Sequence, residues 1–590
     1  MIPSLPPAFI FIGGAVLVPF LRGKVKAAWL LLLPLWALGV IASVPHGLHW
    51  VVEFWDYQLI LGKVDSLSKV FGYGFSIVYF LGTVYALHLE DDLQQVSSLL
   101  YAGGALGVTF AGDFFSLYLF WEVMAVASTF LILAARDKKA QGSAFRYILM
   151  HLAGGLLLLA GILLHHQEGG SLQVGYIGLS GLSSWLIFLG IGVNAALPGL
   201  HFWLTDAYPR ATVTGAVFLC AFTTKSAVYL MARTFPGTEL LIPLGAFMCV
   251  FPIFYATMEN DLRAILSYSL ISQVGYMMVG IGIGSQLSLN GAVSHAFCHL
   301  LYKSLLFMGA GSVLFVTGQN RCSELGGLGR AMPLTMVCTM VGAASICAFP
   351  LFSGFVSKSM IVSAAGHQHL ALTWLMLQFG SAGVILYLGL RVPYAVFLRP
   401  KEVGEAREAP LNMQIAMVAA AVLCVGVALV PGLLYGQLPF PADYEPYTWA
   451  HVLSSLQILG FGALAYVLLI PLGRFLPDRK GINLDVEWFY RKGGRGLNRL
   501  FDRVLNTVNA WSERTLVAGV AAWAGKMAHK GAGLAVYLLL LPFWRLSGTR
   551  QAEMDQRRRT IESTLASGST PVGISAAAAA AVLFVVFALC

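Results

Sequence analysis

Apolar residues form long continuous runs along most of this chain, separated by short segments that hold the polar and charged residues. Runs of this length cross a bilayer as helices, and their continuity differs from the alternating pattern of a membrane β-barrel. The pattern therefore predicts an all-α polytopic membrane protein of about 15–17 helices. We expect them at residues 7–21, 27–44, 67–88, 97–112, 114–135, 144–164, 182–204, 211–232, 239–257, 264–284, 290–317, 333–353 with 355–365, 371–398, 412–435 and 451–473.

The composition supports this class. Hydrophobic residues make up 58% of the 590 residues and charged residues 11%, far below the share of about 25% in soluble domains. The net charge of +9 does not indicate nucleic-acid binding, because the cations lie in short loops and near the C-terminus. The eight cysteines show no metal-ligand spacing, so we expect no metal, no disulfide and no cofactor.

Lysines and arginines gather in the loops that follow odd-numbered helices, for example residues 22–26, 136–139 and 399–401. By the positive-inside rule these loops face the cytoplasm, and the N-terminus lies outside. The first apolar run, 7–21, precedes its positive charges, so we expect a retained helix and not a cleaved signal.

The sequence changes character after residue 474. In residues 482–530 apolar side chains recur three and four positions apart with basic ones between them, which predicts an amphipathic helix along the membrane surface. We interpret residues 531–544 as an interfacial helix, or as one of two crossings if residues 515–528 also insert. Residues 574–590 predict a final short span.

A single carboxylate, Glu122, lies near the middle of the apolar run at residues 113–135. A charge at this depth costs about 2.5–3.5 kcal/mol even on lenient insertion scales, unless a partner or water meets it. The hypothesis that follows is an ion or proton relay. The alternative is a structural glutamate held by neighbouring hydroxyls.

Later helices supply buried bases. Lys225 lies too deep in its span to reach either surface easily, and is either a proton carrier or a static counter-ion. His295, His299 and Lys303 are spaced i, i+4, i+8 and share one helix face, which is a plausible proton wire. A metal site is the weaker interpretation, because no further ligand is spaced near them.

Two of the predicted helices contain breakers. Pro350 and Gly354 interrupt an apolar run just before Lys358, and Pro198 and Gly199 interrupt the run that begins at residue 182. Irregular backbone at membrane depth is tolerated where protein or water satisfies it, so such breaks point to a binding site. Their spacing suggests two repeated bundles.

The sequence has no Walker motif, no GxGxxG after a strand, no Cys-rich cluster and no haem motif, so it does not indicate ATP, NADH or redox chemistry within this chain. Instead it resembles the antiporter-like membrane subunits shared by respiratory complex I (NADH:quinone oxidoreductase subunits L, M and N), Mrp-type Na+/H+ antiporters (subunits A and D) and membrane-bound hydrogenases. The resemblance rests on residues 120–122, 201–209, 224–229, 260–276, 295–307, 325–333 and 353–358.

This resemblance implies two inverted five-helix bundles, each with a broken helix. The chain would divide into N-terminal helices (1–96), a first bundle (97–232), a second bundle (239–400), C-terminal helices (401–475) and an amphipathic, basic extension (476–590). It also implies roles for single residues: a gating carboxylate at Glu122, a central relay at Lys225, His295 and His299, and an exit lysine at Lys358.

One position departs from the family pattern. The family usually has a lysine in the seventh helix, paired with the glutamate of the fifth, and this chain has Asn194 there. Without that cation, Glu122 would be more easily protonated or would pair with Lys225. The change is compatible with altered coupling, with a different ion, or with a partly degenerate channel.

The leading hypothesis is a proton-translocating or Na+/H+-exchanging subunit of a larger complex in the cytoplasmic membrane of a bacterium or archaeon. Its partners would be other membrane subunits, the lipid bilayer, H+ and Na+, and no nucleic acid. The alternatives are a membrane-arm subunit of an NADH:quinone or hydrogenase-type oxidoreductase, and a scaffold that has lost conduction.

Overall fold

The computed structural model describes residues 5–401, 406–469, 485–566 and 583, and the chain divides into two units, Met1–Asp485 and Val486–Cys590. The predicted final span at 574–590 lies outside the described residues, apart from residue 583.

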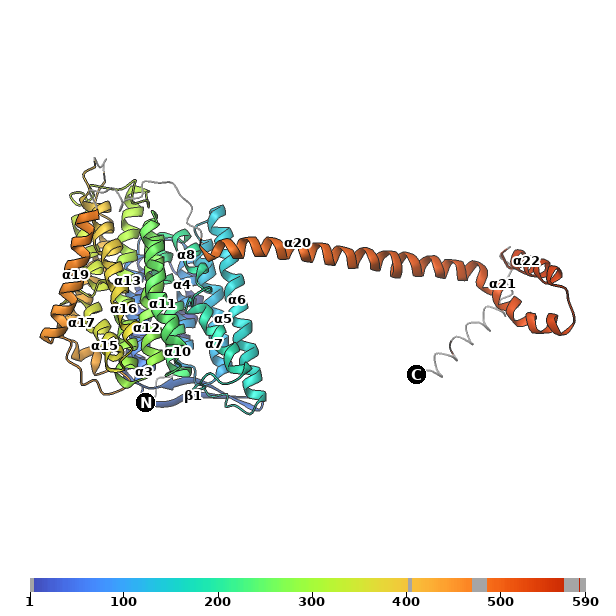
Figure 1. Cartoon of the computed structure of the whole chain (residues 1–590), viewed down its shortest axis with the longest axis horizontal. Coiled ribbons are helices and arrows are strands. Elements are labelled where there is room, and N and C mark those ends of the chain that lie inside the picture. Colours follow the sequence, from blue (N-terminus) through green and yellow to red (C-terminus); the bar gives the residue numbers. More distant parts are fainter. Residues whose placement is uncertain (1–4, 402–405, 470–484, 567–582, 584–590) are drawn as a thin grey trace. The chain divides into compact units, whose positions relative to one another are not determined.

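Helices packed side by side make up the first unit (Figure 1). They are α1 (Pro7–Leu17), α2 (Gly23–Ser43), α3 (Ser66–Tyr85), α4 (Asp92–Phe110), α5 (Phe114–Leu133), α6 (Lys138–Gln167), α7 (Leu182–Asn194), α8 (Phe202–Ala207), α9 (Val213–Leu219), α10 (Thr223–Thr234), α11 (Leu241–Met258), α12 (Leu262–Ile283), α13 (Gln286–Thr317), α14 (Pro333–Ile346), α15 (Ser353–His367), α16 (Ala371–Val384), α17 (Leu411–Leu429), α18 (Gly432–Tyr435) and α19 (Trp449–Leu469). Short 3-10 segments are η1 (Val18–Phe20) and η2 (Tyr208–Arg210), and π-helical segments are η3 (Ile385–Arg391) and η4 (Tyr394–Leu398).

Among the described residues, 11 helices are long and apolar enough to cross a membrane. The predicted helical membrane fold is therefore confirmed. The span expected at 211–232 is present as Val213–Thr234, with an interruption between α9 and α10 that the sequence did not predict. There the Tyr101 hydroxyl accepts the backbone N–H of Thr223 at 3.0 Å, so a side chain replaces a partner in the helix ladder.

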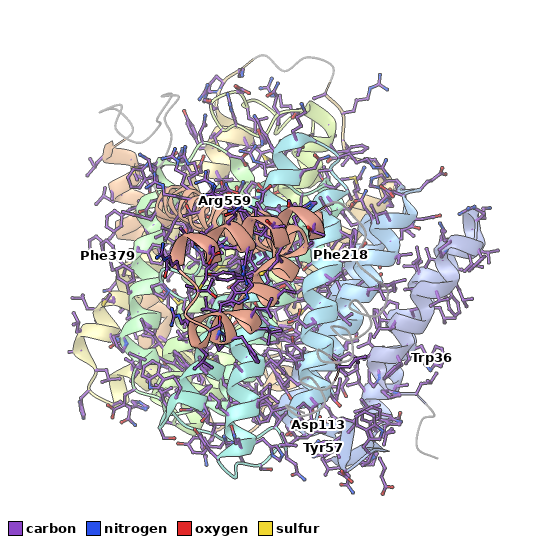
Figure 2. All side chains as sticks on the ribbon, turned by 90° about the vertical axis from the view of Figure 1, so that its right-hand side faces the viewer. Trp36, Tyr57, Asp113, Phe218, Phe379 and Arg559 are labelled. Carbon is purple, nitrogen blue, oxygen red and sulfur yellow. The ribbon has the colours of Figure 1, made fainter. Side chains whose placement is uncertain are left out.

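A hairpin of β1 (Gly47–Phe54) and β2 (Tyr57–Val64) crosses one end of the bundle (Figure 1). The sequence pattern predicted no strand there, because the segment is short and lies between two stronger helical patterns. The N–H of Ile60 donates to the Asp113 carboxylate at 2.6 Å, and Tyr57 packs edge-on against Phe115. Figure 2 shows Tyr57 and Asp113 next to each other at this end, so the hairpin is tied to the start of α5.

The first unit contains an internal repeat that its backbone contacts make visible. Asp113, the N-cap of α5, forms an antiparallel bridge with Gln173, and Asp261, the N-cap of α12, forms the same bridge with Arg321. The two bridges are displaced by 148 residues. Their hydrogen bonds correspond as well: Phe114 donates to the carbonyl of Leu172 at 2.9 Å, and Leu262 donates to that of Asn320 at 2.8 Å.

The described part of the second unit is helical apart from a turn at residues 547–550. It contains α20 (Val486–Ser512), the π-helical segment η5 (Glu513–Gly519), α21 (Val520–Leu546) and α22 (Gln551–Ala566). Large apolar side chains are exposed at three- and four-residue intervals along α20, at Leu497, Leu500, Phe501, Val504, Leu505 and Val508. A stripe of this kind is typical of a helix that covers an apolar surface, so placement along a membrane stays a prediction.

Candidate functional site

The two predicted helix breaks have the same backbone conformation. After α7, Ala196 has φ +55° and is followed by Pro198 and by Gly199 at φ +86°. After α14, the same order recurs: Ala348 has φ +56°, then Pro350 and Leu351, the latter at φ +73°. A left-handed alanine costs about 1–2 kcal/mol, so this turn is retained twice against local preference. It ends one half-helix and starts another inside the bundle.

Two buried lysines lie at the ends of half-helices. The ammonium of Lys225 donates to the carbonyl of Cys220, at the end of α9, at 2.6 Å. The ammonium of Lys358 donates to the carbonyl of Ile346, the last residue of α14, also at 2.6 Å. The last carbonyls of a helix have no partner in the helix and carry partial negative charge, so they are natural acceptors for a buried ammonium.

Helix α13 places His295, His299 and Lys303 on one face, as their spacing predicted, and all three are fully buried. Nδ1 of His295 lies 2.9 Å from the Ser357 hydroxyl, and the ammonium of Lys303 donates to the hydroxyl of Ser269. Both ring nitrogens of His299 are buried without a hydrogen-bond partner. His299 is therefore the one of the three whose nitrogens are open to accept or donate a proton.

The basic groups gather around His299. Its ring lies 6.3 Å from that of His295, and it is within electrostatic range of Lys225, Lys303 and Lys358. Lys358 also lies 4.7 Å from the centre of the Tyr276 ring, which contacts His295. Residues from α10, α13 and α15 thus form one buried cluster, which we call the basic cluster: Lys225, His295, His299, Lys303 and Lys358.

Glu122 is not part of this cluster. Its Oε1 is buried without a hydrogen-bond partner, and the neighbouring polar side chain is Tyr118, one helical turn away on α5. Within the described part of the chain Glu122 forms no ion pair, and the ammonium of Lys225 bonds Cys220 and Thr224 instead. The pairing of Glu122 with Lys225 that the loss of the family lysine suggested is absent from this structure.

Asn194 contacts a histidine that no sequence pattern had indicated. Nδ1 of His151, on α6, lies 2.7 Å from Oδ1 of Asn194, and both side chains are buried. A signal for His151 was available: Tyr147, His151 and Gly155 precede His295, His299 and Lys303 by 148 residues, the displacement of the two bridges. Without a structure nothing identified that displacement.

Two cavities lie next to functional elements of the bundle. A cavity of about 80 Å³ borders Lys358, with Ser359, Ser363 and His451 among its lining residues. This volume holds a few water molecules, and the lining offers them hydrogen-bond partners. A larger cavity of about 760 Å³ extends from Arg22 and Lys24 to Thr214 and Phe218 of α9.

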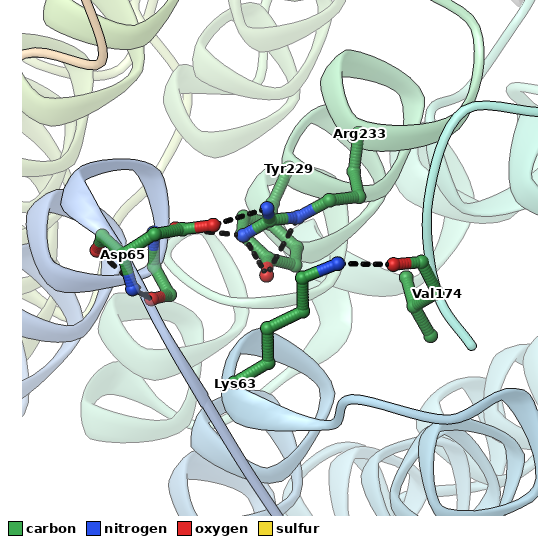
Figure 3. A network of polar contacts seen from close by, with 6 residues as sticks. Lys63, Asp65, Val174, Tyr229 and Arg233 are labelled. Atoms are coloured by element: carbon green, nitrogen blue, oxygen red, sulfur yellow. Dashed lines mark hydrogen bonds and ion pairs between the residues drawn. The ribbon is translucent and has the colours of Figure 1, made fainter. Parts of the chain in front are cut away.

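The far end of α10 is held by an ion pair at the hairpin (Figure 3). The guanidinium of Arg233 bonds both carboxylate oxygens of Asp65, and it donates to the Tyr229 hydroxyl at 2.8 Å. Burial raises the pKa of Asp65, but hydrogen bonds from Arg233 and from Ser68 outweigh burial and leave this pKa below its ordinary value. Lys63 donates to the carbonyl of Val174 at 2.5 Å, and burial lowers its pKa.

A second missed residue is Asp485, the last residue of the first unit. Its buried carboxylate accepts a hydrogen bond from the Tyr268 hydroxyl at 2.8 Å and lies 3.3 Å from Nε2 of His201. His201 ends the first helix break, so Asp485 contacts the first unit at that break. The sequence offered no signal, because 284 residues separate the two partners.

Comparison with known proteins gives a family match. Residues 111–385 match a family described as "NADH:quinone oxidoreductase/Mrp antiporter, TM". The chain is 30% identical over 495 residues to Na(+)/H(+) antiporter subunit A1 of Staphylococcus haemolyticus, which covers 72% of this chain and 61% of that protein. It is 28% identical over 395 residues to NADH-quinone oxidoreductase subunit N of Desulforudis audaxviator, which covers 60% of this chain and 78% of that protein. The chain thus spans about three fifths of the staphylococcal subunit.

The fold also has a solved counterpart. A chain of the membrane-bound sulfane sulfur reductase, an archaeal respiratory membrane complex, superposes with a TM-score of 0.67 at 21% identity. The match covers 91% of this chain and 99% of that chain. These findings confirm the predicted resemblance and identify an integral membrane protein.

Proposed function

Since residues 111–385 belong to the NADH:quinone oxidoreductase/Mrp antiporter family, we propose that this chain is the proton-translocating, antiporter-type subunit of a multi-subunit membrane complex. Relatives are named as subunits of Na(+)/H(+) antiporters and of NADH-quinone oxidoreductase. A chain that moves protons by itself would not need such partners, so a driving partner belongs to the proposal.

The basic cluster is the observation that carries the proposal. Three lysines and two histidines are almost completely excluded from solvent, with exposed fractions of 2% or less. An ionised group at membrane depth is costly in free energy, and its balance between charged and neutral forms depends on the charges of its neighbours. Five such groups close together repel one another when charged, so the cluster favours the release of a proton from one group to the next.

In the proposed mechanism a proton passes between lysine and histidine along the cluster. An ammonium at Lys225 gives up a proton and becomes an amine, and the open nitrogen of His299 takes the proton as an imidazolium. Transfer of this proton to the amine of Lys303 or Lys358 then returns His299 to its neutral form. Because like charges lie within electrostatic range, loading one group favours release from the next.

The two cavities provide access. The larger cavity begins at Arg22 and Lys24, in a basic loop that the positive-inside rule places on the cytoplasmic side, and reaches α9, whose last carbonyl Lys225 caps. The smaller cavity borders Lys358 and lets water reach the other end of the cluster. This orientation puts the N-terminus outside, in the cytoplasmic membrane of a bacterium or archaeon.

A second candidate is a membrane-arm subunit of an oxidoreductase complex. The similarity to NADH-quinone oxidoreductase subunit N, over 78% of that protein, favours it. The two candidates share the proton path and differ in what drives it. Purification of the complex in mild detergent separates them: a peripheral redox arm supports the oxidoreductase, and small membrane subunits alone support the antiporter.

The test of the relay uses everted membrane vesicles that contain the intact complex, with a pH-sensitive dye to follow proton uptake. We expect Lys225→Ala and Lys358→Ala each to abolish uptake, whereas Lys139→Ala, at an exposed position in the first turn of α6, retains it. Sodium-driven quenching distinguishes Na+/H+ exchange from proton pumping alone. Full uptake by both buried-lysine variants would refute the relay, and full uptake after all five basic residues are replaced would leave only a scaffold.

A further inference from the structure

The first bundle contains a buried histidine on α6 that the proposed relay does not use. His151 is 1% exposed and faces α7 from α6, and the repeat places it in register with His299 of the second bundle. We propose that His151 is the proton acceptor of the first bundle, held by Asn194, and that it takes up the proton that Glu122 releases. This inference rests on the proposed function.

The hydrogen bond to Asn194 fixes which ring nitrogen is basic. Oδ1 of Asn194 can only accept, so Nδ1 of His151 donates to it at 2.7 Å and carries the hydrogen of the neutral ring. Nε2 is then the nitrogen with a lone pair, and it is buried without a hydrogen-bond partner. A buried acceptor without a partner is unfavourable, and protonation with a new partner removes that penalty.

Glu122, on α5, lies against the face of α6 that carries His151. A Cβ on Gly155 would lie 1.9 Å from Oε1 of Glu122, so the carboxyl group lies directly against the helix at that residue. His151 is four residues earlier on α6, a rise of about 6 Å, and Tyr147 is four residues earlier still. Oε1 of Glu122, like Nε2 of His151, is buried without a hydrogen-bond partner.

The alternative is a purely structural histidine. The ring of His151 lies 4.2 Å from that of Tyr147 and 4.5 Å from that of Trp203, which is good aromatic packing. A ring selected for packing alone would not need an open nitrogen, nor a carbonyl acceptor that sets its tautomer. Asn194 supplies that acceptor at the position where a cation is expected in the family.

The proposed step is balanced without any further reactant. The O–H bond of protonated Glu122 breaks and an N–H bond forms at Nε2 of His151, which gives a carboxylate and an imidazolium. The positive charge thus arises on His151 only while the proton is in transit. Asn194 keeps its hydrogen bond to Nδ1–H in both states, so it is a positioning residue.

The experiment uses the same vesicles with the intact complex. His151→Phe keeps an aromatic ring between Tyr147 and Trp203 but removes both nitrogens, and we expect at least a tenfold loss of proton uptake. His166→Phe, the same change at the exposed end of α6, is the matched control and should transport as the unchanged chain does.

A chemical rescue separates proton transfer from packing. His151→Ala leaves room for imidazole, and added imidazole should raise proton uptake severalfold in this variant but not in Glu122→Gln. Normal uptake by His151→Phe would overturn the inference, as would a loss in His151→Ala that imidazole does not relieve at normal protein yield. Loss in the Lys225 and Lys358 variants together with normal uptake by His151→Phe would leave the proposed function standing, whereas full uptake by the lysine variants would remove both.

Discussion

The two halves of the first unit are built on one plan but hold different charges. Both begin their second helix with an aspartate cap that bridges to a distant loop, and both break a later helix with a left-handed alanine followed by a proline. At the positions where α13 has His295, His299 and Lys303, α6 has Tyr147, His151 and Gly155. The backbone was thus kept while the ionisable side chains diverged.

This difference separates scaffold from chemistry. The breaks and bridges are satisfied by backbone groups, which every sequence supplies, so they tolerate substitution of the residues around them. A buried charge needs particular partners, so losing one member changes the role of the rest. In the first half the carboxyl group of Glu122 lies against Gly155, one turn of α6 from His151, whereas in the second half bases gather around His299.

The largest effect is expected from removing the base that has no counterpart in the first half. Lys303→Met should reduce proton uptake about a hundredfold, the usual size of loss when a proton-transferring group is removed. Lys139→Met, at an exposed position in the first turn of α6, is the control. Uptake within a factor of two of the unchanged chain would mean that Lys303 is only a packing partner of Ser269.

The counterpart of Lys303 in the first half is Gly155, which gives room to Glu122. A Cβ there would meet Oε1 at 1.9 Å, so Gly155→Ala should displace the carboxyl group and cost about 1–3 kcal/mol of stability, with a severalfold loss of uptake. Gly142→Ala, on the same helix, meets only a flexible arginine at 3.4 Å and should be neutral or stabilising. Equal melting temperatures of the two variants would contradict the close approach.

Each half ends on an arginine, and the two differ in their acceptors. Arg233 bonds the carboxylate of Asp65, whereas Arg391 bonds backbone carbonyls of Thr257 and Glu259, both at 2.8 Å. Asp65→Asn keeps the helix cap but removes the charge, and should lower the free energy of unfolding by about 1–3 kcal/mol at neutral pH.

The pH dependence of this effect has a definite sign. The folded pKa of Asp65 is below its ordinary value of 3.8, so the charged form stabilises the fold above that value. The contribution decreases as the pH falls below 3.8 and is lost below the folded pKa. Thermal unfolding of both proteins across this range should show their difference shrink in acid. A difference that stays constant would exclude the carboxylate as its source.

The smallest effect concerns the two breaks themselves. Ala196→Gly and Ala348→Gly relieve a left-handed alanine but loosen the unfolded chain and remove a buried methyl group. These contributions nearly cancel, so each change should shift stability by less than about 0.5 kcal/mol. We expect the two variants to change stability by the same amount, because the two turns have the same conformation. A difference above about 1 kcal/mol between the variants would show that the surrounding structure holds the two turns differently.

Much of this protein was readable from local patterns. Continuous apolar runs predicted the helices, because each run must satisfy its backbone within itself in lipid. The i, i+4, i+8 spacing of His295, His299 and Lys303 predicted their common face, and Pro198 and Pro350 marked the two breaks. These features depend on residues close together in the chain, where helix geometry alone fixes the outcome.

Tertiary structure decided which of these groups meet. The contacts of His151 with Asn194 and of Asp485 with His201 join residues far apart in sequence, and no local pattern specifies such a pair. Packing likewise gathered Lys225 and Lys358 around His299 and left Glu122 outside the cluster. The sequence by itself determined the helices and the residues that ionise, because both follow from the cost of polar groups in lipid. Only the packing of one helix against another decided their neighbours, because that depends on side-chain shape across the whole bundle.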